Sequence, residues 1–189
     1  LTRMSVDTAS YAMEIQGGNG YVSDFVTHRL YRDVQALPIW EGTANILSLD
    51  VLRAMGKENA HEPLLALVEE YLADVDHPYL ADIAMTVREE FESLQEAMVA
   101  LATEDDDYAQ HEAKEVTEYI FDVTTASLLL SRAQESLDEG DARKAVVADL
   151  FVRRTFGEED ARGVTDGDAL PMEFFDALVR YDSLDPDRL

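Results

Sequence analysis

The sequence contains no cysteine, which excludes disulfides and thiolate metal sites and agrees with a cytoplasmic location. It also contains no apolar run close to the roughly 18 residues of a membrane-spanning helix, and no signal peptide is visible. We therefore expect no membrane association. The chain opens Leu1-Thr2-Arg3 without an initiator methionine, so we expect it to be a fragment of a longer polypeptide.

Lysine is scarce as well, since only Lys57, Lys114 and Lys144 occur among the 15 basic residues. Against them stand 40 acidic residues, which gives a formal net charge of -25. This balance indicates a halophilic protein that stays hydrated in concentrated salt, where screening weakens the repulsion between like charges. An acidic mimic of nucleic acid is the alternative, but the acids are spread over every segment rather than massed in one block.

Strand signals are almost absent, and apolar residues recur instead at helical spacing. The fold class is therefore predicted to be all-α, an antiparallel helix bundle. We expect a helical turn near residues 26–33 within a loop over 17–38, and polar connections at 57–62 and 157–168. The predicted helices cover 4–16, 43–55, 63–75, 80–101, a long segment between Asp105 and Gly140, 141–156, and a last helix from Pro171.

Breakers and caps give the expected helix ends. Gly17-Gly18 ends the first helix, Gly56 ends the second, and Asp105-Asp106-Asp107 caps the long one. The second helix has few polar positions, so we expect it to be buried on most sides. Gly56 also precedes a polar connection, and we place a domain boundary there, between residues 1–56 and an acidic helical domain over 57–189.

Two short motifs stand out for their chemistry. The first is Ile39-Trp40-Glu41-Gly42-Thr43-Ala44-Asn45-Ile46, in which a carboxylate sits where a loop becomes a helix. On its own, such a carboxylate is a charge placed favourably against the helix dipole. The second is Gly17-Gly18-Asn19-Gly20-Tyr21, which on its own is a helix-stopping turn or a cradle for phosphate.

Other polar residues carry structural predictions only. We expect Arg29 and Arg32 to form a salt-bridge cluster with Asp33. The four histidines, His28, His61, His77 and His111, lie at no metal-ligand spacing, so no metal site is predicted.

In this order and spacing, the two motifs resemble the C-terminal helical domain of the acyl-CoA dehydrogenases, FAD enzymes that oxidise acyl-CoA thioesters. The resemblance covers about the first 56 residues well. It implies that Glu41 is the base that removes the α-proton of the thioester while hydride leaves the β-carbon for the flavin. A base for so weak an acid needs a desolvated carboxylate with a raised pKa. Trp40 would help to exclude water, and Gly42 would let the backbone approach the substrate.

The resemblance also implies the cofactor contacts. Thr43 and Asn45 would bind the adenosine part of FAD, although as ordinary residues they are a helix N-cap and a first-turn residue. The backbone of Gly17 and Gly18 would face the FAD pyrophosphate, and that FAD usually belongs to a neighbouring subunit. The implied partners are an acyl-CoA substrate, an electron-transfer flavoprotein or similar acceptor, and further copies of the chain in a homo-oligomer.

One branch fits best, the DNA-alkylation-response homologues of the acyl-CoA dehydrogenases. The residues that carry this likeness are Ala12-Met13-Glu14-Ile15, Ile39-Trp40-Glu41-Gly42 and Leu49-Asp50-Val51-Leu52-Arg53. That branch has an extra C-terminal helical region, which is basic and implicated in DNA binding. Here residues 57–189 are strongly acidic, so counterion release cannot drive DNA binding, and we do not expect it.

The sequence leaves two hypotheses of different classes. In the first, the chain is the C-terminal portion of an FAD-dependent acyl-CoA dehydrogenase and is inactive as an isolated fragment, because the flavin cradle and most of the CoA site lie elsewhere. In the second, it is a non-catalytic helical module for oligomerisation or interaction, since half a bundle leaves the apolar faces of residues 4–16 and 43–55 in need of cover.

Overall fold

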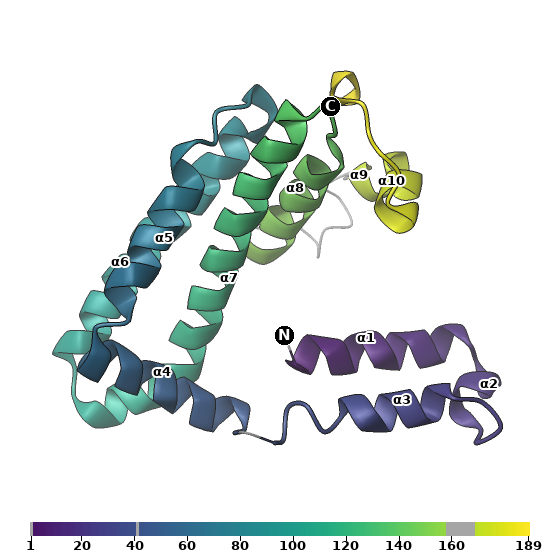
Figure 1. The fold of residues 1–189 in the computed structure, drawn as a ribbon. Coiled ribbons are helices and arrows are strands. Elements are labelled where there is room, and N and C mark those ends of the chain that lie inside the picture. The colour runs from purple at the N-terminus through teal and green to yellow at the C-terminus, as the bar shows by residue number, and fades with distance from the viewer. Residues whose placement is uncertain (1, 41, 158–168) are drawn as a thin grey trace. The chain divides into compact units, whose positions relative to one another are not determined.

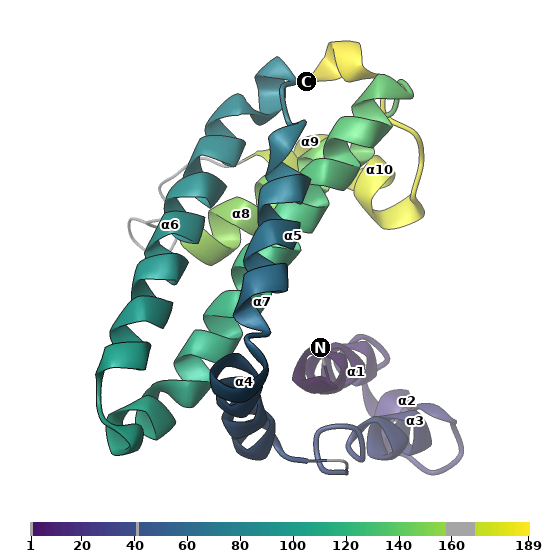
Figure 2. The ribbon, with the colours of Figure 1, turned by 60° about the vertical axis from the view of Figure 1, so that its left-hand side comes forward.

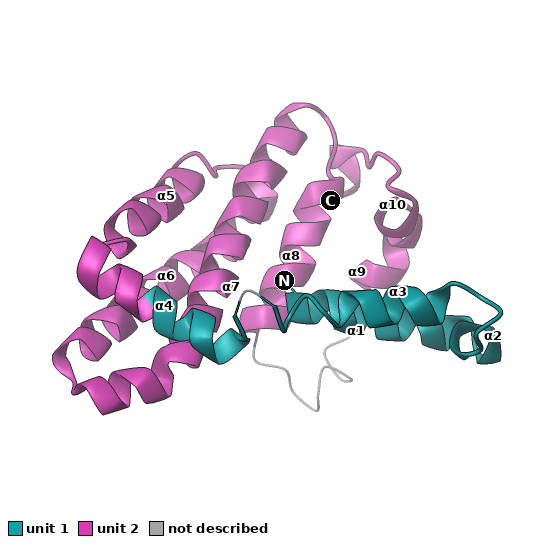
Figure 3. Ribbon diagram, turned by 60° about the horizontal axis from the view of Figure 1, so that its bottom comes forward, with its two compact units in different colours: residues 1–51 teal, residues 52–189 magenta. Residues whose placement is uncertain are grey.

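The computed structural model describes residues 2–40, 42–157 and 169–189, and every regular element among them is helical. The all-α prediction is confirmed. Two compact units divide the chain, unit 1 over Leu1–Val51 and unit 2 over Leu52–Leu189. Figure 3 colours these units separately.

Unit 1 is built around a helical hairpin. Helix α1 (Thr2–Ile15) is followed by the short α2 (Gly18–Tyr21) and by α3 (Thr27–Val34), and α3 packs back along α1 (Figure 1). The buried Thr27 hydroxyl donates a 2.7 Å hydrogen bond to Gln16 Oε1, which ties the start of α3 to the end of α1. Val6 is the one hydrophobic residue of α1 that the structure buries.

Helix α4 (Ala44–Glu58) differs from its prediction in two ways. It continues through Gly56 and ends before Asn59, which adopts a left-handed φ of 52°. The Ala60 N–H then reaches back to Ala54 O at 3.2 Å, so a left-handed asparagine, rather than the glycine, ends the helix. The expected burial on most sides is also wrong, because among its residues only Ser48 is buried and Ile46 is 59% exposed.

Unit 2 is an up-and-down arrangement of four longer helices, in which α7 contacts each of the other three (Figures 1 and 2). Its shorter elements lie near the ends of these helices. The elements are α5 (His61–Ala73), η1 (Pro78–Leu80), α6 (Ala81–Thr103), α7 (Asp106–Asp138), α8 (Arg143–Phe156), α9 (Leu170–Glu173), α10 (Phe175–Arg180) and η3 (Pro186–Arg188).

The predicted apolar stripes form the core of unit 2. Residues from α5, α6, α7 and α8 make one buried cluster that also includes Phe174, Ala177 and Leu184 from the C-terminal part of the chain. Asp105 caps α7 as predicted, because its Oδ1 accepts the Tyr108 N–H at 2.9 Å. Gly140, with a φ of 86°, follows the end of α7 as predicted.

The predicted last helix differs in detail. It begins at Leu170, one residue before Pro171, and it is divided at Phe174 into α9 and α10. The predicted loop over 157–168 lies almost wholly outside the described residues. At the C-terminus, Leu184 turns back onto the α7–α8 junction, where its N–H donates to Asp141 Oδ1 at 2.9 Å and its C=O accepts from Ala142 N at 2.7 Å.

Candidate functional site

The predicted base, Glu41, lies outside the described residues, so the structure reports on its neighbours. Before it, the Trp40 N–H donates to Ala36 O at 3.2 Å and closes a turn, while the indole-bearing residue is 66% exposed. After it, Gly42 has a φ of 117°, a conformation that side-chain-bearing residues rarely adopt. A Cβ there would lie 3.2 Å from Leu47 Cδ2. Gly42 is therefore required by the backbone itself, independently of any ligand.

The start of α4 is formed by local hydrogen bonds. Thr43 C=O accepts the Leu47 N–H at 3.0 Å, which makes Thr43 the residue at which the helix hydrogen bonding begins. Thr43 and Asn45 are both exposed, so the hydroxyl and the amide are reachable by a ligand. The buried Ser48 donates to Ala44 O at 2.9 Å and takes no part in this exposed edge.

The glycine turn is formed in the same local way. Gly17 has a φ of 57°, and its N–H donates to Glu14 O at 2.9 Å, so that N–H already serves the end of α1. A Cβ on Gly18 would meet no atom within 4 Å, which leaves bare backbone open to an approaching group. Gly20, which belongs to the glycine motif but was not among the predicted FAD contacts, is the sterically demanding glycine, because its Cβ would lie 2.4 Å from Met13 O.

The remaining polar residues of the sequence prediction are placed as follows. Arg29 Nε lies 3.8 Å from Asp33 Oδ2, and both side chains are exposed, so this pair contributes little stability. Among residues 2–40, 42–157 and 169–189, no group of three or more metal-ligating side chains could hold a metal ion. In the same ranges, no helix is both long and apolar enough to cross a membrane.

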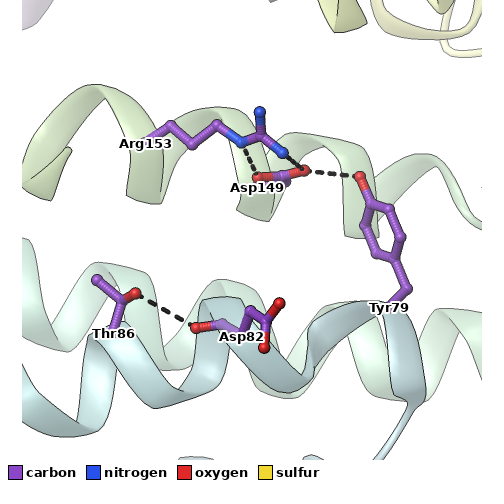
Figure 4. Close-up of polar contacts among 5 residues, drawn as sticks. All are labelled: Tyr79, Asp82, Thr86, Asp149 and Arg153. Carbon is purple, nitrogen blue, oxygen red and sulfur yellow. Dashed lines mark hydrogen bonds and ion pairs between the residues drawn. The ribbon is translucent and has the colours of Figure 1, made fainter. Parts of the chain in front are cut away.

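The sequence analysis missed a buried carboxylate in unit 2. Asp149 on α8 is 1% exposed and accepts three hydrogen bonds (Figure 4). Tyr79 Oη donates to its Oδ2 at 2.7 Å, and Arg153 donates to its Oδ1 at 2.5 Å and to its Oδ2 at 3.0 Å. The i, i+4 spacing of Asp149 and Arg153 within the predicted helix was the available signal. Because the Tyr79 hydroxyl and the Arg153 guanidinium satisfy its carboxylate oxygens, we assign this acid a structural role.

Three titratable groups with displaced pKa values lie in unit 2. Burial, and then the hydrogen bond to Glu90, raise the pKa of the Tyr119 hydroxyl. Burial, and then the charge of Glu118, raise the pKa of Asp122. For Asp141, partial burial favours the neutral acid, but hydrogen bonds from the Leu184 and Arg143 N–H groups outweigh it and lower the pKa. These shifts accompany packing between helices rather than a shared cleft.

One hollow of about 470 Å³ lies between α5 and α6. Arg88 crosses it and donates to the C=O of Leu72 at 2.8 Å, next to the C-terminal end of α5. None of the residues predicted for a site lines it; the lining residues are Glu69, Leu72, Ala73, Arg88, Phe91, Glu92 and Gln95.

Comparisons with known proteins bear on unit 1 first. Residues 1–56 match the family described as "Acyl-CoA dehydrogenase, C-terminal domain". Acyl-CoA dehydrogenase family member 11 of Caenorhabditis elegans is 52% identical over 58 residues, which are 30% of this chain and 9% of that protein. Putative acyl-CoA dehydrogenase AidB of Escherichia coli (strain K12) is 46% identical over 55 residues, which are 29% of this chain and 10% of AidB. The matched segment thus spans about a tenth of these relatives.

A solved structure extends the likeness into unit 2. The crystal structure of Caenorhabditis elegans ACDH-11 in complex with C11-CoA superposes with a TM-score of 0.70 and 26% sequence identity. The superposition covers 92% of this chain and 31% of that one, so it reaches well past residue 56. The helical region after residue 56 therefore has a structural counterpart in a much longer protein.

Proposed function

We propose that this chain is the C-terminal portion of an FAD-dependent acyl-CoA dehydrogenase, because residues 1–56 match the family model of the C-terminal domain of these enzymes. The reaction is the α,β-dehydrogenation of an acyl-CoA thioester. The observation that carries the proposal is the family match over residues 1–56, the range that holds both motifs, together with 52% identity to a named family member over 58 residues. The superposition on a protein solved with C11-CoA supports an acyl-CoA substrate.

Glu41 is the proposed base. Its carboxylate takes the α-proton of the thioester as the β-carbon gives up a hydride. FAD, when bound, accepts that hydride. Trp40 and Gly42 flank Glu41 in the chain and are the proposed substrate contacts. Trp40 is exposed in this chain, so its shielding of the base requires segments of the complete enzyme outside these 189 residues.

Four residues are the proposed contacts to FAD, and their surroundings fit that group. Gly17 and Gly18 present backbone without side chains, and a Cβ at either position would meet nothing within 4 Å, which suits the approach of a pyrophosphate. Gly18 is the first residue of α2, where a backbone N–H lacks an acceptor within its own helix. Thr43 and Asn45 expose their polar groups at the start of α4 and would meet the adenosine part.

The expected partners follow from the same family. They are an acyl-CoA, an electron-transfer flavoprotein or similar acceptor, and further copies of the chain, because the glycine turn faces the FAD of a neighbouring subunit in this family. The isolated 189-residue chain is expected to be inactive, since this family builds the flavin cradle and most of the CoA site from other segments. We place the enzyme in the cytoplasm.

The test uses the complete protein that contains this C-terminal portion. We expect it to bind FAD and to reduce an artificial electron acceptor when supplied with butyryl-, isovaleryl- or undecanoyl-CoA. Thr43→Ala is expected to weaken FAD binding by about tenfold, the equivalent of one hydrogen bond. Thr103→Ala, at the exposed C-terminal end of α6, is the matched control and should leave FAD affinity unchanged. A complete protein that binds no flavin would contradict the proposal.

A second candidate function rests on the exposed apolar residues of unit 1. Tyr11 and Ile15 on α1 and Ile46 and Leu47 on α4 are exposed, and such a surface is typical of an interface. A non-catalytic oligomerisation or interaction module would use these faces without flavin. Sedimentation of the complete protein with and without FAD separates the two hypotheses, because the module assembles regardless of the cofactor.

We also propose that the acidic surface is an adaptation to concentrated salt. With a net charge of -25, the folded chain repels itself in dilute buffer, and salt screens that repulsion. The melting temperature should therefore rise between about 0.1 M and 2 M KCl. A melting temperature that is unchanged or lower at the higher salt concentration would remove this part of the proposal.

A further inference from the structure

Helix α4 consists of two halves with different surroundings. Its first half, up to Val51, belongs to unit 1 and exposes Ile46, Leu47 and Leu49. Its second half belongs to unit 2, where Leu52 and Met55 are partly buried against the core cluster of that unit. One continuous helix thus has its apolar packing on a core at its C-terminal end and the candidate FAD residues at its N-terminal end.

A helix of this length does not stand on its own. Isolated helices shorter than about 12–15 residues are marginal in water, and most helical stability in proteins comes from packing of an apolar face. Gly56 within the helix lowers its intrinsic stability by about 1 kcal/mol relative to alanine. The packing of Leu52 and Met55, together with the left-handed turn at Asn59, is what offsets this.

Helix formation is cooperative, so order at one end spreads along the ladder of hydrogen bonds. The packing of Leu52 and Met55 on the core of unit 2 stabilises the helical turn that contains them, and this turn favours the one before it. The stabilisation extends in this way to the first hydrogen bond of the helix, from Leu47 N–H to Thr43 O. In the described part of α4, the first half has only Ser48 buried, so its own packing contributes little.

We propose that Leu52 and Met55 are positioning residues, through which unit 2 keeps α4 helical as far as Thr43 and Asn45. The role assigned to unit 2 is to supply the folding free energy of the helix that carries the cofactor contacts. The chemistry of Thr43 and Asn45 rests on the proposed function, but the coupling between the two ends of α4 does not. The rival explanation is that segments outside this chain order the first half of α4.

The first arm of the test is amide hydrogen exchange in the 189-residue chain. The double substitution Leu52→Ala/Met55→Ala removes the anchor, whereas Leu49→Ala removes an exposed apolar group from the same helix and is the control. Alanine favours helix in all three positions, so propensity is not lost. We expect exchange at Leu47, Ser48 and Leu49 to be at least tenfold faster in the anchor variant and within twofold of wild type in the control.

Amides of α7 report on unit 2 in the same experiment. They should keep their protection in the anchor variant, since the core residues of α6, α7 and α8 are untouched. If α7 also loses protection, the single substitution Met55→Ala replaces the double one, and Met55→Leu, which restores apolar volume, must return the α4 amides to the wild-type rate. Unchanged exchange in α4 while the anchor is removed would overturn the proposal in favour of the rival explanation.

The second arm measures FAD affinity of the complete protein. We expect the anchor variant to bind FAD at least fivefold more weakly and the control variant to bind it as wild type does. Faster exchange in α4 with unchanged FAD affinity would support the role of Leu52 and Met55 in keeping α4 helical, but it would refute Thr43 and Asn45 as cofactor contacts. Weaker FAD binding without faster exchange would refute the anchor and leave the proposed function standing.

Discussion

Unit 1 and unit 2 of this chain obtain their structure in different ways. Every buried hydrophobic residue in the described ranges lies in unit 2, apart from Val6. Unit 1 instead depends on local backbone geometry, in particular the close approach at Gly20 and the left-handed glycines at 17 and 42. The segment that matches the family model therefore lies mostly in the unit with the smaller core, and most of the buried apolar surface belongs to unit 2, which the match covers only over residues 52–56.

The largest expected effect lies in the core of unit 2. Leu130→Ala, at a fully buried position of α7, should lower the free energy of unfolding by about 3 kcal/mol. Ile46→Ala, at an exposed position of α4, should change it by less than about 0.5 kcal/mol. Urea unfolding followed by far-UV circular dichroism checks both. Equal decreases in the free energy of unfolding for the two variants would contradict the difference between the units.

The buried acid gives the next effect. Asp149→Ala removes the acceptor of the Tyr79 hydroxyl and of two Arg153 N–H groups. We expect the free energy of unfolding to fall by about 2 kcal/mol. Asp176→Ala is the control, because it breaks another i, i+4 Asp–Arg pair, at 3.3 Å from Arg180, in which both side chains are exposed. That variant should lose less than about 0.5 kcal/mol in the same urea titration. A similar loss for both would mean that burial does not distinguish them.

In unit 1, a single methyl group should have a local effect. Gly20→Ala places a Cβ against Met13 O, so α1 and α2 must move apart. We expect this movement to destabilise the contact between α1 and α2 by about 1–2 kcal/mol. Gly18→Ala in the same helix meets no atom within 4 Å and is the control. Hydrogen exchange should quicken over α1 and α2 in the first variant only, with α7 unchanged in both. Loss of protection in α7 would show that the units are not independent in stability.

The smallest effect is the pH dependence of the Asp141 contact. Because the folded-state pKa of Asp141 is lowered, its carboxylate contributes stability above its unfolded pKa of about 3.9, and that stability is lost as the pH falls through the folded value. The free energy of unfolding of the Asp141→Ala variant should therefore be about 1 kcal/mol lower than that of wild type near neutral pH. This difference in unfolding free energy between wild type and the variant should become smaller below about pH 4. A gap that instead widens as the pH falls would contradict the lowered pKa of Asp141.

The core of unit 2 was predictable because its apolar residues recur every three or four positions. The stripe from Leu80 to Leu101 and the Asp105 cap appear in the structure as expected. The apolar run of α4 was misleading. Ile46 and Leu49 are as apolar as core residues, but the structure leaves them exposed, and composition alone does not say whether another segment covers such a face.

Helix ends and buried polar groups were harder to predict. Gly56 does not end α4, because a glycine breaks a helix only where the chain turns left-handed, and Asn59 takes that conformation. Asp149 was missed because its partner Tyr79 is distant in the sequence. In the candidate site, the positive φ of Gly42 explains why a glycine stands at that position. The structure describes the surroundings of Thr43 and Asn45, whereas Glu41 lies outside the described residues.

The central claim is that Glu41 is the base of an acyl-CoA dehydrogenase. Its most direct test is anaerobic mixing of the complete flavoprotein with an acyl-CoA substrate, in wild type and in Glu41→Gln, while the visible absorbance of oxidised flavin is followed. We predict that both proteins bind FAD, that wild type loses this absorbance as its flavin is reduced, and that the variant reduces its flavin about a thousandfold more slowly, in line with the removal of a general base. Flavin reduction at the wild-type rate in Glu41→Gln would contradict the assignment of the base.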